Sequence, residues 1–267
     1  MLLVGIPVNN NYASSVSLPT QVSRGTDPQS YPPDIRRQSS EEESRELFLL
    51  RMARDEAIGN DRQGSDRYWQ EAIALSETTW GPDHPVTAAF LGKFASALDE
   101  QQRYVDAEAL YRRALKIHRS RLDPSDASTG VLLEQLATNL ELQGRSKEAE
   151  DYYRQALAIV DRPRSDQSML SVTLSNLGRS LNSQGRFGEA EPFLRRALQI
   201  AETTNGQDSP DVVLSLNNLT ANLEAEGRVE EARSLRARAR ALPTPPDAGR
   251  RRVARRNFTS GRSQNRA

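Results

Sequence analysis

Few side chains in this sequence have types and spacings that suit catalysis. There is no cysteine, and the two histidines are His84 and His118. Thiol catalysis, a disulfide framework and a thiolate metal site are therefore excluded. No serine stands in a Gly-x-Ser-x-Gly turn, and no glycine-rich loop precedes a Lys-Ser or Lys-Thr pair. We expect no catalytic residue, no metal site and no cofactor.

An arginine cluster could bind polyanions. Segment 243–267 contains seven arginines and one aspartate, a net charge of +6. Arginines neutralise the phosphates of nucleic acid or of acidic lipid. The simpler interpretation is an end that keeps the protein in solution. The candidate polyanion-binding residues are Arg250, Arg251, Arg252, Arg255 and Arg256.

Amide side chains recur at a regular spacing. Gln135, Asn176 and Asn218 follow one another at steps of 41 and 42 residues. A carboxamide carries both donors and an acceptor, so a ladder of amides can pair with the backbone of an extended peptide. The alternative is an ordinary solvated polar face. Which of the two applies depends on the elements that carry these residues.

Those elements are repeats. Four similar phrases begin at Gln102, Gly144, Gly185 and Gly227, at steps of 42, 41 and 42 residues. They read QRYVDAEALYRRALKI, GRSKEAEDYYRQALAI, GRFGEAEPFLRRALQI and GRVEEARSLRARARAL. Self-similarity at such a period is typical of a repeat architecture.

Apolar residues at fixed offsets from these four starting points predict two helices in each unit. Large apolar residues stand eleven, eight and four residues before each start, and alanines stand five and twelve after it. Such offsets are those of one helical face. Glycine at the start suits a left-handed cap that ends the first helix, and Gln102 is the exception. The positions are Leu91, Leu133, Leu174 and Leu216; Phe94, Leu136, Leu177 and Leu219; Leu98, Leu140, Leu181 and Leu223; Ala107, Ala149, Ala190 and Ala232; Ala114, Ala156, Ala197 and Ala239.

The series Leu-x-x-Leu-Ala/Gly-x-x-Leu, then Ala, then aromatic-x-x-Ala, resembles the tetratricopeptide repeat over roughly residues 45–242. The longer period and junctions such as TTWGPDHP are similar to the repeats of kinesin light chains. The resemblance implies an all-α fold, a right-handed alpha-solenoid of antiparallel helix pairs. It also implies a protein without catalytic activity, whose first helices line a concave groove that binds other proteins.

The predicted organisation has three parts. Residues 1–40 and 243–267 lack periodicity, and we expect both to be disordered. Residues 41–242 form the repeat domain, with four clear units and one degenerate unit before them. The apolar residues expected in the first helix of the degenerate unit are Leu49, Met52 and Ala53.

In the family, polar residues beside the large apolar ones on the first helices face the ligand. The resemblance therefore implies a partner-binding groove, and its candidate residues are Lys93, Ser96, Gln135, Thr138, Asn176, Arg179, Asn217 and Asn218. Lys93 and Arg179 lie two units apart, which argues against a clamp for a terminal carboxylate. The tail could itself occupy the groove by contacting acidic residues at one equivalent position, Asp99, Glu141 and Glu224.

The leading hypothesis is a scaffold that binds a peptide or helical segment of another protein. The alternative is a binder of nucleic acid or acidic membrane that acts through the arginine tail, and self-association stays open. No stretch reaches the roughly 20 apolar residues of a membrane span. The apolar start MLLVGIPV lacks a basic residue before it, so we expect an ordinary terminus and a cytoplasmic protein.

Overall fold

The computed structural model describes residues 62–163 and 165–242, and in these ranges it contains nine α-helices and no strand. Segments 1–40 and 243–267 and the first helix expected for the degenerate unit lie outside the described residues. The helices are α2 (Arg62–Thr79), α3 (Pro85–Glu100), α4 (Tyr104–Arg121), α5 (Ala127–Leu142), α6 (Ser146–Val160), α7 (Gln167–Ser183), α8 (Phe187–Asn205), α9 (Pro210–Ala225) and α10 (Val229–Ala241).

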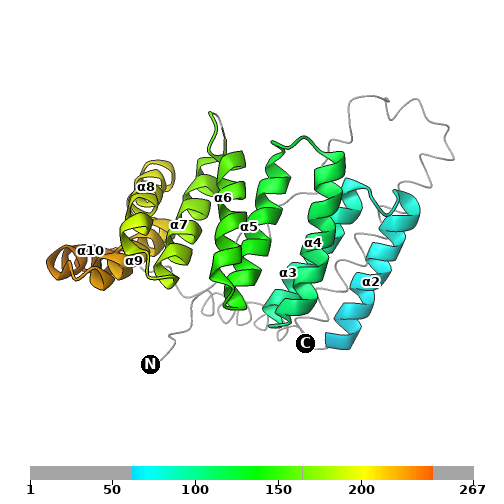
Figure 1. The fold of residues 1–267 in the computed structure, drawn as a ribbon, viewed down its shortest axis with the longest axis horizontal. Coiled ribbons are helices and arrows are strands. Elements are labelled where there is room, and N and C mark those ends of the chain that lie inside the picture. Colours follow the sequence, from blue (N-terminus) through cyan, green and yellow to red (C-terminus); the bar gives the residue numbers. More distant parts are fainter. Residues whose placement is uncertain (1–61, 164, 243–267) are drawn as a thin grey trace, which may run out of the picture. The chain divides into compact units, whose positions relative to one another are not determined.

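The chain divides into two compact units, with the boundary between Val160 and Asp161. Among the described residues, unit 1 contains α2 to α6 and unit 2 contains α7 to α10. Within each unit, every helix packs against the next along the chain, and Figure 1 shows them side by side. The first helices of the clear repeats are α3, α5, α7 and α9, and the second helices are α4, α6, α8 and α10. The predicted all-α array of antiparallel helix pairs is confirmed.

The core consists of the periodic leucines and alanines. All twenty positions predicted at the five offsets are buried, and the most exposed is Ala239, at 9% of its surface. The alanines let second-helix backbones approach their neighbours closely, since a larger side chain in such a contact would overpack it. Tyr111, Tyr153 and Leu194 fill the space between the alanines and are also buried. Arg236, their counterpart in α10, is exposed.

Each first helix of the clear repeats ends in the same left-handed turn. Gly144, Gly185 and Gly227 have φ angles of 77°, 75° and 79°. The next backbone N–H turns back to the helix, as where Arg145 N donates to Leu140 O at 2.9 Å. This pattern is a Schellman motif, which satisfies carbonyls that the helix end leaves unpaired. Gln102 adopts the turn at φ 62° although it carries a side chain.

Buried asparagines join one hairpin to the next inside each unit. Asn139 Nδ2 on α5 donates to Asp99 Oδ1 at 2.6 Å and to Tyr104 O at 2.9 Å, both in the preceding hairpin. Asn222 Nδ2 on α9 makes the equivalent bonds to Asn182 Oδ1 at 2.8 Å and to Phe187 O at 2.9 Å. Both asparagines are fully buried, so losing either partner would leave an unsatisfied polar group in the core.

Arginines that follow the turns add a second link between hairpins. Each pairs with a carboxylate on the preceding second helix and with one three residues ahead in its own helix. The cross-hairpin pairs are Arg103–Asp66 at 2.5 Å, Arg145–Glu108 at 2.6 Å and Arg228–Glu191 at 2.8 Å. These arginines are about one-third exposed, so each pair contributes little free energy. Their repetition in register favours one alignment of neighbouring hairpins.

Replacing Gln102 with glycine is expected to stabilise unit 1. Glutamine at a positive φ costs roughly 1 kcal/mol, and glycine avoids that cost. Urea unfolding of the full chain should therefore show a higher free energy of unfolding for Gln102→Gly by up to about 1 kcal/mol. Gly185→Gln places glutamine in the equivalent turn of unit 2, and this variant should have a free energy of unfolding lower by a similar amount. A less stable Gln102→Gly protein would contradict this account of the turn.

The leucine core gives a second expectation. Leu136 is fully buried on α5, and truncating it leaves a cavity. Leu136→Ala should lower the free energy of unfolding by about 2–5 kcal/mol in urea denaturation. Ala158→Gly, at an exposed site of α6, should cost only about 1 kcal/mol because it removes helix propensity and no packing. Equal losses for the two variants would show that Leu136 does not hold the core.

The buried carboxylate of Asp99 makes stability depend on pH. Burial raises the pKa of Asp99 from 3.8 to about 6, although hydrogen bonds from Asn139 and Tyr111 oppose the rise. A carboxyl group whose pKa is higher in the folded state stabilises the fold only while protonated. Its contribution is therefore lost as pH rises from about 4 to about 6.

Asp99→Asn should remove the fall in the free energy of unfolding that accompanies ionisation of the Asp99 carboxyl group. Asn182 already accepts the equivalent bond from Asn222, so asparagine suits the position. The free energy of unfolding of Asp99→Asn, measured in urea at several pH values, should exceed that of the unmodified chain above pH 6, with a smaller difference at pH 4. Asp161 provides the opposite control, because Arg196 lowers its pKa. Asp161→Asn should be destabilising at pH 7. If Asp99→Asn left the pH dependence of the free energy of unfolding unchanged, burial would not be raising the pKa of Asp99.

Candidate functional site

The predicted groove residues of unit 1 lie on two first helices that contact each other. Lys93 and Ser96 are on α3, Gln135 and Thr138 are on α5, and all four are half-buried. In unit 2, α7 and α9 contact each other in the same way. We call the eight predicted groove residues the first-helix surface: Lys93, Ser96, Gln135 and Thr138 in unit 1, and Asn176, Arg179, Asn217 and Asn218 in unit 2.

Lys93 has an unusual environment for an ammonium group. Burial lowers the pKa of Lys93, because the charged form loses hydration. None of the described residues forms an ion pair with it. A carboxylate from a partner would therefore find at Lys93 a cation that is partly desolvated and not yet neutralised.

Thr138 is engaged within its own hairpin. Its Oγ1 atom lies 3.0 Å from the hydroxyl oxygen of Tyr153 on α6, at hydrogen-bonding distance. In the preceding hairpin, the Tyr111 hydroxyl donates to Asp99 Oδ2 at 3.0 Å. The hydroxyls of these two buried tyrosines thus end beside the first-helix surface. A partner that hydrogen-bonded Thr138 would compete with Tyr153.

The predicted amide ladder is divided between the units. Asn176 on α7 and Asn218 on α9 are half-buried on contacting helices of unit 2, whereas Gln135 belongs to unit 1. Asn217 is exposed beside Asn218, and Arg179 is half-buried on α7. Within unit 2, two amides thus lie on helices that contact each other. A ladder of three stays a prediction.

The hypothesis that the tail occupies the groove stays a prediction too. Arg250, Arg251, Arg252, Arg255 and Arg256 lie outside the described residues. Two of the carboxylates proposed to attract them already have contacts. Asp99 accepts bonds from Tyr111 and Asn139, and Glu224 pairs with Arg236.

Both histidines have structural roles. His84 Nδ1 accepts a hydrogen bond from Val86 N at 3.2 Å and so caps the start of α3. His118 is buried, with Nδ1 3.2 Å from Thr129 Oγ1. In residues 62–163 and 165–242, no group of three or more His, Cys, Asp or Glu side chains could hold a metal ion. In the same ranges, no helix is both long and apolar enough to cross a membrane.

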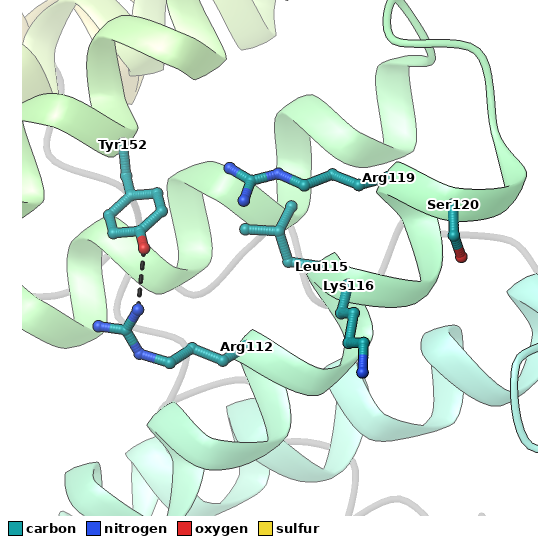
Figure 2. Close-up of a pocket in the computed structure, with 6 residues that line it drawn as sticks. All are labelled: Arg112, Leu115, Lys116, Arg119, Ser120 and Tyr152. Carbon is teal, nitrogen blue, oxygen red and sulfur yellow. Dashed lines mark hydrogen bonds between the residues drawn. The ribbon is translucent and has the colours of Figure 1, made fainter.

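Unit 1 also contains a pocket that sequence reasoning missed. It lies between the second helices α4 and α6, has a volume of about 320 Å³ and is shown in Figure 2. We call it the second-helix pocket, and its residues are Arg112, Leu115, Lys116, Arg119, Ser120 and Tyr152. Three of the six are cations.

Figure 2 shows Arg112 and Arg119 extending from α4 on either side of Leu115. Arg112 Nη1 donates to the Tyr152 hydroxyl at 2.9 Å, and its guanidinium carbon lies 5.8 Å from the centre of the tyrosine ring. Arg119 Nη2 donates to Gln155 Oε1 at 2.9 Å. The sequence signal for this pocket was present: Lys116 stands where the other repeats have alanine or glutamine, and Arg119 stands where other repeats have a carboxylate.

Several solved structures have folds similar to that of this chain. A putative kinesin light chain with nearly identical TPR-like repeats from Podosopora anserina has a TM-score of 0.65 and 23% sequence identity, covering 74% of this chain and 94% of that one. BtubC (BKLC) from P. vanneervenii has a TM-score of 0.61 and 20% identity, covering 88% and 98%. A Rap protein complexed with Competence and Sporulation Factor has a TM-score of 0.58 and 20% identity, covering 73% and 53%.

These likenesses establish the fold. No curated protein sequence matches the chain. The family model described as tetratricopeptide repeat matches residues 45–120, 89–162 and 169–243, which together make up well over half of the sequence. The buried leucines and alanines, the left-handed turns and the paired helices are the features that such a match requires. The chain belongs to the tetratricopeptide repeat family.

Proposed function

We propose that this protein is a non-catalytic scaffold that binds a peptide or helical segment of another protein on the first-helix surface. The observation that carries the proposal is the set of polar residues on contacting first helices, most of them half-buried, with Lys93 partly desolvated and without an ion pair to any described residue. In this proposal a partner's backbone pairs with Asn176 and Asn218 in unit 2. In unit 1, a partner carboxylate neutralises Lys93. The proposed setting is the cytoplasm.

Two considerations support this function. First, the surface is built on helices fixed by a fully buried core, so little ordering entropy opposes association. Second, a protein of similar fold, the Rap protein, was solved in complex with Competence and Sporulation Factor. The same architecture therefore accommodates a partner in at least one relative of the fold.

The amides of unit 2 provide the test. A peptide is first selected on the full chain from a random display library, and its Kd is then measured by fluorescence anisotropy. The double variant Asn176→Ala, Asn218→Ala should weaken binding about tenfold or more, since losing hydrogen bonds at a desolvated contact costs roughly 1–3 kcal/mol. Thermal unfolding should show that both units remain folded.

Gln199→Ala is the matched control, because Gln199 is an exposed amide on the second helix α8 of the same unit. It should leave the Kd of the selected peptide unchanged. If the double variant bound the peptide as tightly as the unmodified chain, these two asparagines would not be part of the binding surface. If Gln199→Ala weakened binding as much, the site would lie on the second helices.

A further inference from the structure

One ion pair recurs between consecutive second helices. It joins a carboxylate near the end of one second helix to an arginine in the middle of the next. The three pairs are Glu77–Arg113 at 2.5 Å, Asp161–Arg196 at 2.6 Å and Glu202–Arg238 at 2.5 Å. Their sequence separations are 36, 35 and 36 residues, so they occupy equivalent positions of the repeat.

The junction between α4 and α6 departs from this rule. Its equivalent positions carry Arg119 in place of the carboxylate and Gln155 in place of the arginine. The two side chains still meet, with Arg119 Nη2 donating to Gln155 Oε1 at 2.9 Å. The geometry of the junction is thus kept while its charge changes from balanced to positive.

Neighbouring residues increase the positive charge. Lys116 stands where unit 2 has Gln199, and Tyr152 stands where unit 2 has Leu235. Neither Lys116 nor Arg119 forms an ion pair with any described residue. Arg112, in contrast, is offset by Glu108 at 2.8 Å and Glu148 at 3.7 Å. The second-helix pocket therefore carries two cations that the described residues of unit 1 do not neutralise.

We propose that the second-helix pocket binds an acidic segment of a partner protein. A partner carboxylate would supply the negative charge that Glu77, Asp161 and Glu202 supply in the three ion pairs, with Arg119 and Lys116 as its cations. Arginine binds carboxylates in a bidentate manner. Leu115 and the ring of Tyr152 supply an apolar wall for the methylenes of glutamate. A carboxylate is favoured over phosphate because carboxylates neutralise the arginines in the three equivalent ion pairs.

This inference goes beyond the function proposed for the first-helix surface. It assigns a second site, on α4 and α6, that uses none of the predicted groove residues. The double substitution of Asn176 and Asn218 should leave it unaffected. The two proposals can therefore fail separately.

The probe is fluorescein-labelled hexaglutamate, titrated into the full chain. Because the arginine-rich tail also attracts this peptide, binding is read residue by residue from ¹H–¹⁵N NMR spectra. The backbone amide signals of Lys116, Ser120 and Tyr152 should shift on titration. Those of Gln199 and Leu235, at equivalent positions in unit 2, should stay in place. The shifts should diminish as salt rises.

The decisive variant is the double substitution Arg119→Glu, Gln155→Arg, which rebuilds the ion pair of the other junctions and should fold normally. It should abolish the shifts at Ser120 and Tyr152 and reduce site affinity at least tenfold. Lys147→Glu is the matched control, since Lys147 is an exposed cation on α6 away from the pocket. It should change site affinity less than twofold.

Three results would overturn the proposal. The first is the absence of shifts at Lys116, Ser120 and Tyr152 at millimolar hexaglutamate. The second is an equal loss of affinity in Lys147→Glu and in the rebuilt ion-pair variant, which would indicate general attraction to a basic surface. The third is a single-stranded oligonucleotide that shifts these signals where hexaglutamate does not, which would make the pocket a phosphate site.

Discussion

The close approach of helix backbones at the buried alanines determines how the described part of this chain folds. Alanine stands five and twelve residues after each turn, and each of these methyl groups is buried. A methyl group allows the second helices to pack tightly against their neighbours. The alanines and leucines take up most of the apolar surface of each helix, and the predicted groove residues beside them are polar. Binding in such a fold therefore depends on polar and charged side chains arranged on a rigid frame.

The fold was predictable from the sequence because its determinants are periodic and local. The leucine and alanine offsets predicted which side chains are buried, and the glycines predicted where the first helices end. Gln102 is a position where the local sequence does not predict the backbone conformation. It lacks the glycine signal, yet the surrounding hairpin holds it in the same left-handed turn. The asparagines at 139 and 222 were missed, since their role depends on a backbone carbonyl in the preceding hairpin.

The candidate sites were predictable to different degrees. The first-helix surface follows from the register of the repeat, and the structure places its unit 1 members on contacting helices. The sequence could not show the burial, hydrogen bonds and ion pairs of each side chain on this surface. Thr138 lies at hydrogen-bonding distance from a buried tyrosine, and Lys93 is half-buried with no ion pair to the part of the chain that the structure describes. The second-helix pocket was missed because the sequence does not show that Arg119 contacts Gln155. Only that contact, compared with the three ion pairs at equivalent positions, reveals that the charge of Arg119 is unusual.

The recurring carboxylate–arginine pairs also bear on how such a chain can grow. A hairpin whose second helix carries the arginine in its middle and the carboxylate near its end can pair with a copy of itself, so a duplicated hairpin meets its neighbours without charge conflict. The junction of α4 with α6 lacks this match. An ordinary hairpin inserted after α4 would set its arginine against Arg119, so a duplication at this point meets a charge repulsion that the matched junctions avoid.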